Sequence, residues 1–299
     1  MKKNIVVILF CMFSLPFMAM EQDSSVVFKA GFLNKELQCY EVTRVEYTLQ
    51  KGDTTALQSI RFKVHVNVTD STDNYYILSW RFSDYSIDTN DPDLKEMIDL
   101  ARPVRISYRI SKPGALMEFL DWEEVNSCLD DALPKVLEPF LTKKNTDSVS
   151  KAEVSRIYEL RETMSTLMLQ AVRQFHQAYG LGYKLGEVIE DPTEVNSRFS
   201  SKPIKGVIRK KLARIDTENH FAELTTATFL NKNELKAALS NYLHTDTIPS
   251  SSLDQENIGG LVMDLSTGWL IWSFDQREGK AGSSIYGDMI EIQHISETI

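Results

Sequence analysis

Residues that could bind a metal or act as nucleophiles are few in this sequence, and they are not spaced for either task. The five histidines of the 299-residue chain form no HExxH pair, and no two cysteines form a CxxC motif, so a zinc site has no support. The stretch 282–287 is rich in glycine and serine but lacks the GxSxG spacing of a nucleophile elbow. We therefore expect no catalytic residue of these classes, no metal and no cofactor.

One group of carboxylates has the composition of a hydrolase site: Glu118, Asp121, Glu123 and Glu124. Two of them could act as the acid and the base or nucleophile of glycoside hydrolysis. Acidic residues at the start of a helix are also explained by the helix macrodipole alone. A hydrolase is therefore the last of three functional interpretations, and we expect the protein not to be an enzyme.

The segment 269–274 departs from the pattern of a half-buried strand, because it is apolar on both faces. One interpretation is a central strand that is covered by a helix on one side and by a loop or sheet on the other. The other interpretation is a concave aromatic surface that holds an apolar ligand. The candidate ligand-binding residues are then Trp269, Trp272 and Phe274.

The first twenty residues have the layout of a secretory signal peptide. Lys2 and Lys3 precede an uncharged run from Ile5 to Met20. This run is shorter than the roughly twenty residues that a membrane span needs. Because bulky residues occupy the positions before each candidate cleavage point, an uncleaved anchor is the alternative. We expect a periplasmic or secreted protein, with no membrane span after signal cleavage.

Export determines how the cysteines are interpreted. Without the signal, Cys39 and Cys128 are the only two thiols of the chain. In an oxidising compartment they could form a disulfide, which we carry forward as a hypothesis. The alternative is two buried apolar thiols, because free cysteine is often buried.

The overall composition limits the classes of partner. With 42% hydrophobic and 25% charged residues, the chain is globular in type, which excludes disordered, collagenous and polytopic membrane proteins. The 33 basic and 42 acidic residues give a formal net charge of −9, so nucleic acid and anionic lipid are not expected as bulk partners. A lipophilic small molecule or another envelope protein is the expected partner.

The elements that would position these residues follow an order that recurs in the chain. The first unit has a hairpin at 57–69 and 74–82, a short helix at 91–101, and a hairpin at 103–110 and 115–120. The second has a hairpin at 205–215 and 220–229, a helix at 232–243, and a hairpin at 259–265 and 269–275. This order predicts an internal duplication. The alternative is that hairpins and short helices recur in any α+β protein.

Between the two units, a long helix is the clearest expected element. Ser150 and Glu153 form a capping box, apolar residues then recur at steps of three and four, and Gly180 ends the helix. The sequence thus predicts an α+β fold with two β-rich lobes of antiparallel hairpins, duplicated and joined by this long α-helix. The expected divisions are a signal peptide at 1–20, an N-terminal lobe at 21–121, a helical connector at 122–200 and a C-terminal lobe at 201–299.

Two stretches carry a resemblance to known proteins. The segment from Gly260 to Trp269, taken with 108–111 and Phe119, resembles the strand, turn, strand signatures of uncharacterised exported bacterial families. Those families imply no particular activity. More distantly, curved sheets crossed by helices resemble the half-barrels of periplasmic lipoprotein carriers, a resemblance of fold that implies binding of acyl chains.

The function that these observations favour is that of an exported soluble envelope protein that binds a lipophilic ligand. Such a protein needs a cavity against the strand that carries Trp269 and Trp272. The alternative is a protein–protein interaction module, which needs an exposed apolar patch or sheet edge instead.

Overall fold

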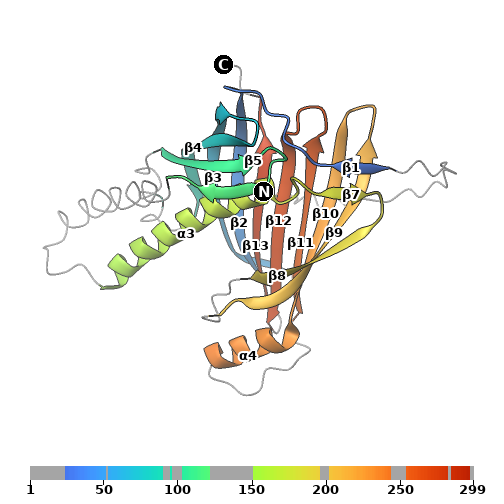
Figure 1. The fold of residues 1–299 in the computed structure, drawn as a ribbon. Helices are drawn as coiled ribbons and strands as arrows, with labels where there is room; N and C mark the ends of the chain where they lie inside the picture. The colour runs from blue at the N-terminus through green and yellow to red at the C-terminus, as the bar shows by residue number, and fades with distance from the viewer. Residues whose placement is uncertain are drawn as a thin grey trace, which may run out of the picture.

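The computed structural model describes residues 24–51, 53–89, 95, 103–121, 151–195, 202–243, 254–281 and 284–296. Within these ranges the chain forms one antiparallel sheet of 11 strands, a smaller two-stranded sheet, and the helices α3 and α4 (Figure 1). The described part of the protein is therefore mostly β.

The large sheet is a meander in which sequence neighbours pair, except at one seam. In space the strands follow the order β6, β5, β4, β3, β2, β13, β12, β11, β10, β9 and β8. Their bounds are β2 Leu37–Gln50, β3 Asp53–Ser71, β4 Tyr75–Asp88, β5 Val104–Ser111, β6 Leu116–Phe119, β8 Val188–Val195, β9 Ile204–Asp216, β10 Phe221–Leu230, β11 Asp254–Asp264, β12 Leu270–Ala281 and β13 Ser284–His294. The seam is the pairing of β2 with β13, which joins the two halves of the chain.

Alternation along the strands gives the sheet two different faces. In β3, Phe62, Val64, Val66 and Val68 are fully buried, while the residues between them are polar. Successive side chains of a strand point to opposite faces, so these four lie on one face. We call it the inner face, and the opposite one the outer face.

Helix α3 (Lys151–His176) covers part of the inner face, where it packs on β12 and β13 (Figure 1). Its buried residues recur at helical spacing and include Leu167, Met168, Ala171, Val172 and Phe175. The left-handed Gly180, with φ of 78°, follows shortly after its end. The second helix, α4 (Lys232–Leu243), places Leu235 and Ala238 against Ile204 of β9 in a small separate core.

The segment 24–32, which we call the N-terminal strap, holds the end of the inner face at which α3 stops. It begins with β1 (Ser25–Val27), which pairs with β7 (Gly182–Lys184) in the two-stranded sheet. Further along, the Ala30 amide donates to the Pro113 carbonyl at 3.1 Å and the Gly31 amide donates to the Thr267 carbonyl at 3.1 Å. The strap therefore ties the β5–β6 turn to the β11–β12 turn.

The predicted α+β class with two lobes is wrong. Both expected lobes belong to one sheet, because β2 and β13 pair continuously from Tyr40 opposite His294 to Gln50 opposite Ser284. Helix α3 does not connect separate lobes; it lies on the single sheet, and β7 and β8 follow it within the expected helical connector. Periodicity reports local pairs, whereas this seam joins strands more than 200 residues apart.

The expected hairpins are present as β3–β4, β5–β6, β9–β10 and β11–β12, and the expected helix at 232–243 is α4. The expected helix at 91–101 lies outside the described residues apart from residue 95. The two sets of strands have the same spatial order, β3 to β6 and β9 to β12. Any meander has this order, so common origin stays a prediction.

Position 268, in the β11–β12 turn, requires glycine for two reasons: its backbone conformation and the close approach of neighbouring atoms. Its φ is 76°, a region that residues with a Cβ rarely adopt. A Cβ there would lie 2.2 Å from the Lys29 carbonyl oxygen and 2.8 Å from the Gly31 nitrogen. The strap can therefore approach this turn only because no side chain is present.

We expect Gly268→Ala to lower the free energy of unfolding more than Gly186→Ala, as measured by urea denaturation. Gly186 has nearly the same φ, 79°, but no atom lies within 4 Å of its added Cβ. Gly186→Ala should cost the left-handed strain alone, about 1 to 2 kcal/mol. Gly268→Ala should cost at least about 1 kcal/mol more, because the strap must move. Equal losses would show that the strap does not depend on this contact.

Candidate functional site

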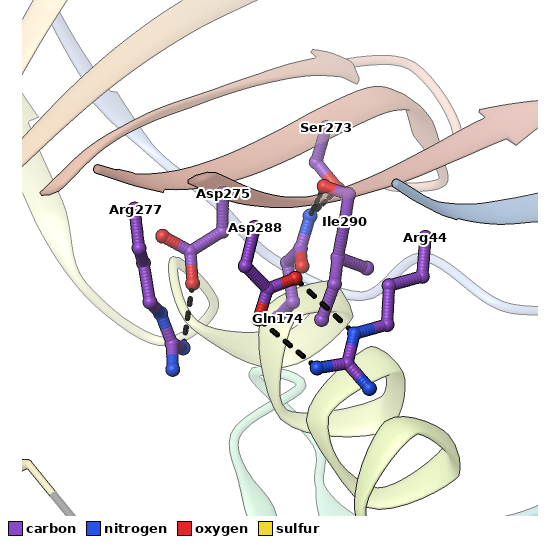
Figure 2. A network of polar contacts seen from close by, with 7 residues as sticks. All are labelled: Arg44, Gln174, Ser273, Asp275, Arg277, Asp288 and Ile290. Carbon is purple, nitrogen blue, oxygen red and sulfur yellow. Dashed lines mark hydrogen bonds and ion pairs between the residues drawn. The ribbon is translucent and has the colours of Figure 1, made fainter. Parts of the chain in front are cut away.

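Charged side chains occupy the inner face of β2, β12 and β13, where core residues would be expected (Figure 2). In the strand register Asp275 lies opposite Ile290, and Ile290 opposite Arg44. The next row that points to the same face has Arg277 opposite Asp288 and Asp288 opposite Glu46. Both rows therefore share the face that Ser273 presents to α3.

The guanidinium groups in these rows are held by carboxylates. Arg44 donates from Nε to Oδ1 of Asp288 and from Nη2 to Oδ2, both at 3.2 Å, which is the bidentate geometry (Figure 2). Its Nη2 also lies 2.6 Å from Oε1 of Glu46. On β12, Arg277 Nη2 donates to Oδ2 of Asp275 at 2.9 Å.

Arg44 is the most enclosed member of the group, with a side chain 16% exposed. Burial lowers the pKa of Arg44, but the hydrogen bond and the charge of Asp288, together with the charge of Glu46, outweigh burial and raise that pKa overall. Arg44 is therefore permanently charged. Two guanidinium groups stand beside three carboxylates, so the group has a net charge of −1.

Gln174 of α3 marks the boundary between the apolar and polar parts of the inner face. Its Nε2 donates to Oγ of Ser273 at 3.0 Å and to the carbonyl of Ile290 at 3.3 Å (Figure 2). The row through Ser273, towards the strap, is apolar and includes the fully buried Leu261 and Ile292. On the other side of this boundary the charged rows begin.

The charged rows continue towards the β8 edge of the sheet. Lys210 of β9 lies in the same inner-face row as Asp275, because Thr226 and Gly259 connect the two in the strand register. Its Nζ lies 2.8 Å from Oδ2 of Asp191 of β8. The Lys210 side chain is only 12% exposed. We call the charged inner-face residues the polar belt: Arg44, Glu46, Asp191, Lys210, Asp275, Arg277 and Asp288.

The structure separates the three aromatic residues that the sequence put forward for ligand binding. Trp269 is buried; its ring stacks on Phe32 of the strap with centroids 3.8 Å apart, and its Nε1 donates to Oε1 of Glu36 at 2.7 Å. Trp272 and Phe274 lie on the outer face, half-buried, with centroids 5.0 Å apart. Their role in binding a ligand stays a prediction.

The remaining candidate residues from the sequence do not gather at one site. Glu118 forms an ion pair with Arg109 on the outer face, and Asp121 is half-buried after β6. Glu123, Glu124 and Cys128 lie outside the described residues. Cys39 is buried on the outer face of β2, and its bridge to Cys128 stays a prediction.

The polar belt was missed, although the sequence carries a signal for it. In β2 the inner-face positions Tyr40, Val42, Arg44 and Glu46 change from apolar to charged at a constant period of two. A charged residue at a position that continues an apolar alternation points to the face shared with the core. Reading the alternation beyond its apolar half would have identified the belt.

A buried histidine lies at the opposite, apolar end of the inner face. His176, at the end of α3, has Nε2 2.8 Å from the Tyr108 hydroxyl and Nδ1 2.9 Å from the Gly114 carbonyl oxygen. The carbonyl can only accept, so Nδ1 carries the proton and Nε2 accepts from the hydroxyl. Burial lowers the pKa of His176 to about 3, so the ring is neutral at pH 7.

Within the described ranges, no group of three or more histidine, cysteine or acidic residues is arranged to hold a metal ion. Among the helices of the same ranges, none has both the length and the apolar character needed to cross a membrane.

His176 should make the protein sensitive to acid. A histidine with a folded-state pKa of about 3 contributes stability above its unfolded pKa of about 6.5, and this stability is lost as the pH falls. Between pH 7 and pH 5 it should account for a loss of about 2 kcal/mol. His176→Gln should remove that part of the slope in urea denaturation, while His220→Asn, at an exposed histidine, should retain it. A variant with the full wild-type slope would contradict this assignment.

The ion pair of Arg44 and Asp288 should show coupling in a double-mutant cycle. Arg44→Gln should cost about 1 to 2 kcal/mol of unfolding free energy, because it leaves partly enclosed carboxylates without a partner. Combining it with Asp288→Asn should recover about 1 kcal/mol of the summed losses. The exposed pair Arg209–Glu190, truncated in the same way, should show a coupling below about 0.5 kcal/mol. Equal coupling in the two pairs would show that the enclosure of Arg44 adds nothing to its ion pair with Asp288.

Comparison with solved structures gives a weak structural likeness. No family model matches the sequence, and no curated protein matches it either. Among solved structures, one of lipovitellin, described as lipid–protein interactions in lipovitellin, has a TM-score of 0.41 and 7% identity, and it covers 90% of this chain. The chain corresponds to 25% of the length of that lipovitellin chain. At this level the likeness supports no conclusion about ligand or activity.

Proposed function

We propose that the protein is an exported, non-enzymatic binding protein that holds an amphipathic molecule on the inner face of its sheet. The observation that supports this proposal is the polar belt. Five charged side chains on β2, β12 and β13 share a face with the core, yet the carboxylates of Asp275 and Asp288 are 34% and 30% exposed. Partial burial of the belt lowers the local dielectric and strengthens polar contacts, while the exposed carboxylates remain accessible to a ligand.

The charge arrangement favours a zwitterionic head group. Each guanidinium stands beside a carboxylate, so neighbouring donors and acceptors can bind an anionic and a cationic group of the same ligand. A purely anionic head group would meet three carboxylates as well as two guanidinium groups.

Apolar side chains for the rest of the ligand lie beside the belt. Ile189 of β8 lies opposite Lys210, and Ile208 of β9 lies opposite Asp191, so both belong to inner-face rows of the belt. Both isoleucines are half-buried. A ligand chain that packs on Ile189 and Ile208 does not have to displace α3 from the apolar rows of the inner face.

The test is a fluorescence titration with a labelled lysophosphatidylethanolamine, beside a fatty acid that carries the same label and chain. We expect saturable binding of the zwitterionic probe and weaker binding of the fatty acid. Arg277→Gln should weaken probe binding about tenfold, since it removes one charge-assisted contact. The matched control is Arg209→Gln, at an exposed arginine that also pairs with a carboxylate.

Thermal melting of each variant separates lost binding from lost folding. Absence of saturable binding to the wild-type protein would overturn the proposal, as would equal weakening by the two arginine variants. Native mass spectrometry of protein purified from its own host tests the ligand class directly, because a bound amphiphile adds its mass.

A protein–protein interaction module is the second candidate, and the outer face supports it. Trp272 and Phe274 are half-buried there, and Ile258, in the adjacent row, is 36% exposed. Trp272 Nε1 donates to Oε1 of Glu291 at 2.6 Å, which fixes the indole on the surface. Trp272→Ala should leave the probe titration unchanged if the inner face binds the ligand.

A further inference from the structure

Two arginines lie directly opposite each other on the outer face of β4 and β5. Arg81 and Arg105 are register partners, and both side chains are exposed. In an antiparallel pair, opposite Cβ atoms are about 5 Å apart, and like charges in this position destabilise the sheet. The positive charges of Arg81 and Arg105 therefore repel each other across the β4–β5 pair.

Described carboxylates on the same face are paired with other basic residues. Three neighbouring basic residues of the outer face each have an acidic partner: Arg61 with Glu41, Lys63 with Asp84, and Arg109 with Glu118. In the part of the chain that the structure describes, no carboxylate forms an ion pair with Arg81 or Arg105. The repulsion between the two guanidinium groups is thus not compensated by a described residue.

The row beside the arginines supplies hydroxyl groups. Ser79 and Ser107 are also register partners, and they are only 6% and 9% exposed. Arg105 donates from Nε to Oγ of Ser79 at 2.8 Å, which directs its guanidinium over the serine row. Among the described contacts, the Nη atoms of Arg105 and the guanidinium of Arg81 have no hydrogen-bond acceptor. Hydroxyl groups therefore lie next to guanidinium donors that remain available.

We propose that Arg81 and Arg105, together with Ser79 and Ser107, form a binding site for a phosphate-class oxyanion. Guanidinium groups bind phosphate through parallel, charge-assisted hydrogen bonds, and hydroxyl groups donate to the same oxygens. A bound dianion would replace the repulsion between the arginines with two attractions. The site is on the face opposite the polar belt, and it does not rest on the function proposed above.

Free phosphate, a phosphorylated small molecule and a lipid head group share this chemistry, so the experiment has two arms. In the first, inorganic phosphate is added to the purified protein at constant ionic strength, with sodium chloride as the reference. We expect 10 mM phosphate to raise the melting temperature by about 3 °C, as for a dissociation constant near 1 mM. In the second, sedimentation compares vesicles of phosphatidylglycerol with vesicles of phosphatidylcholine.

Arg81→Gln and Arg105→Gln should each abolish the phosphate shift and any selective binding to phosphatidylglycerol. Because Arg81→Gln removes a repulsion and no described side-chain hydrogen bond, it should melt no lower than the wild-type protein when phosphate is absent, so its lost response is not a loss of folding. The control is Arg214→Gln, since Arg214 is an exposed arginine that pairs with Asp216 on β9.

The outcomes separate the sources of the anion. A phosphate shift without vesicle binding supports a soluble phosphate ligand, and vesicle binding that phosphate inhibits supports a lipid head group. The proposal is overturned if the wild-type protein shows neither response, or if Arg214→Gln weakens a response as much as Arg81→Gln does.

Discussion

The pairing of β2 with β13 is the constraint on which the rest of the structure depends. It brings together strands from the two ends of the described chain, and the long loop between them makes the closure entropically costly. Polar side chains cross this seam on both faces. Inside, Arg44 binds Asp288; outside, Tyr47 binds Glu278 and accepts from Nε2 of Gln276 at 3.0 Å. The ring of Tyr47 can lie flat on β13 only because residue 287 is glycine, whose added Cβ would lie 2.0 Å from that ring.

Once the seam is closed, the two ends of the inner face take different roles. At the strap end, Phe175 of α3 packs edge-on against Tyr40 and Trp80, with centroids 5.3 Å from each. Two of the buried tyrosines there donate their hydroxyl groups to backbone carbonyls: Tyr40 to Leu270 at 3.0 Å and Tyr179 to Gly268 at 2.5 Å. The apolar packing that stabilises the fold is therefore concentrated at the strap end, and the charged side chains lie at the belt end.

The sequence was informative where the signal is local. The hairpins and α4 were expected from periodicity and turn residues, and each is present. The seam was not expected, because nothing local distinguishes β2 or β13 from strands of separate lobes. The segment 269–274 shows a second limit: a β-bulge leaves Ile271 without a partner in β11, so Leu270 and Ser273 are both buried although they are three residues apart. The strict period of two that the sequence pattern assumes therefore does not hold along the whole segment.

Stability alone does not account for the polar belt. Enclosing an ion pair costs desolvation free energy, and replacing such a pair with packed apolar residues is often neutral or stabilising. The row beside the belt shows that apolar residues fit this face, because Leu261 and Ile292 are fully buried in it. Arg44 is nevertheless held by two carboxylates in a sheet that could have been sealed with leucine or isoleucine at the same positions. The requirements of the fold therefore do not explain this charge, whereas the proposed binding of a polar head group on the inner face would require it.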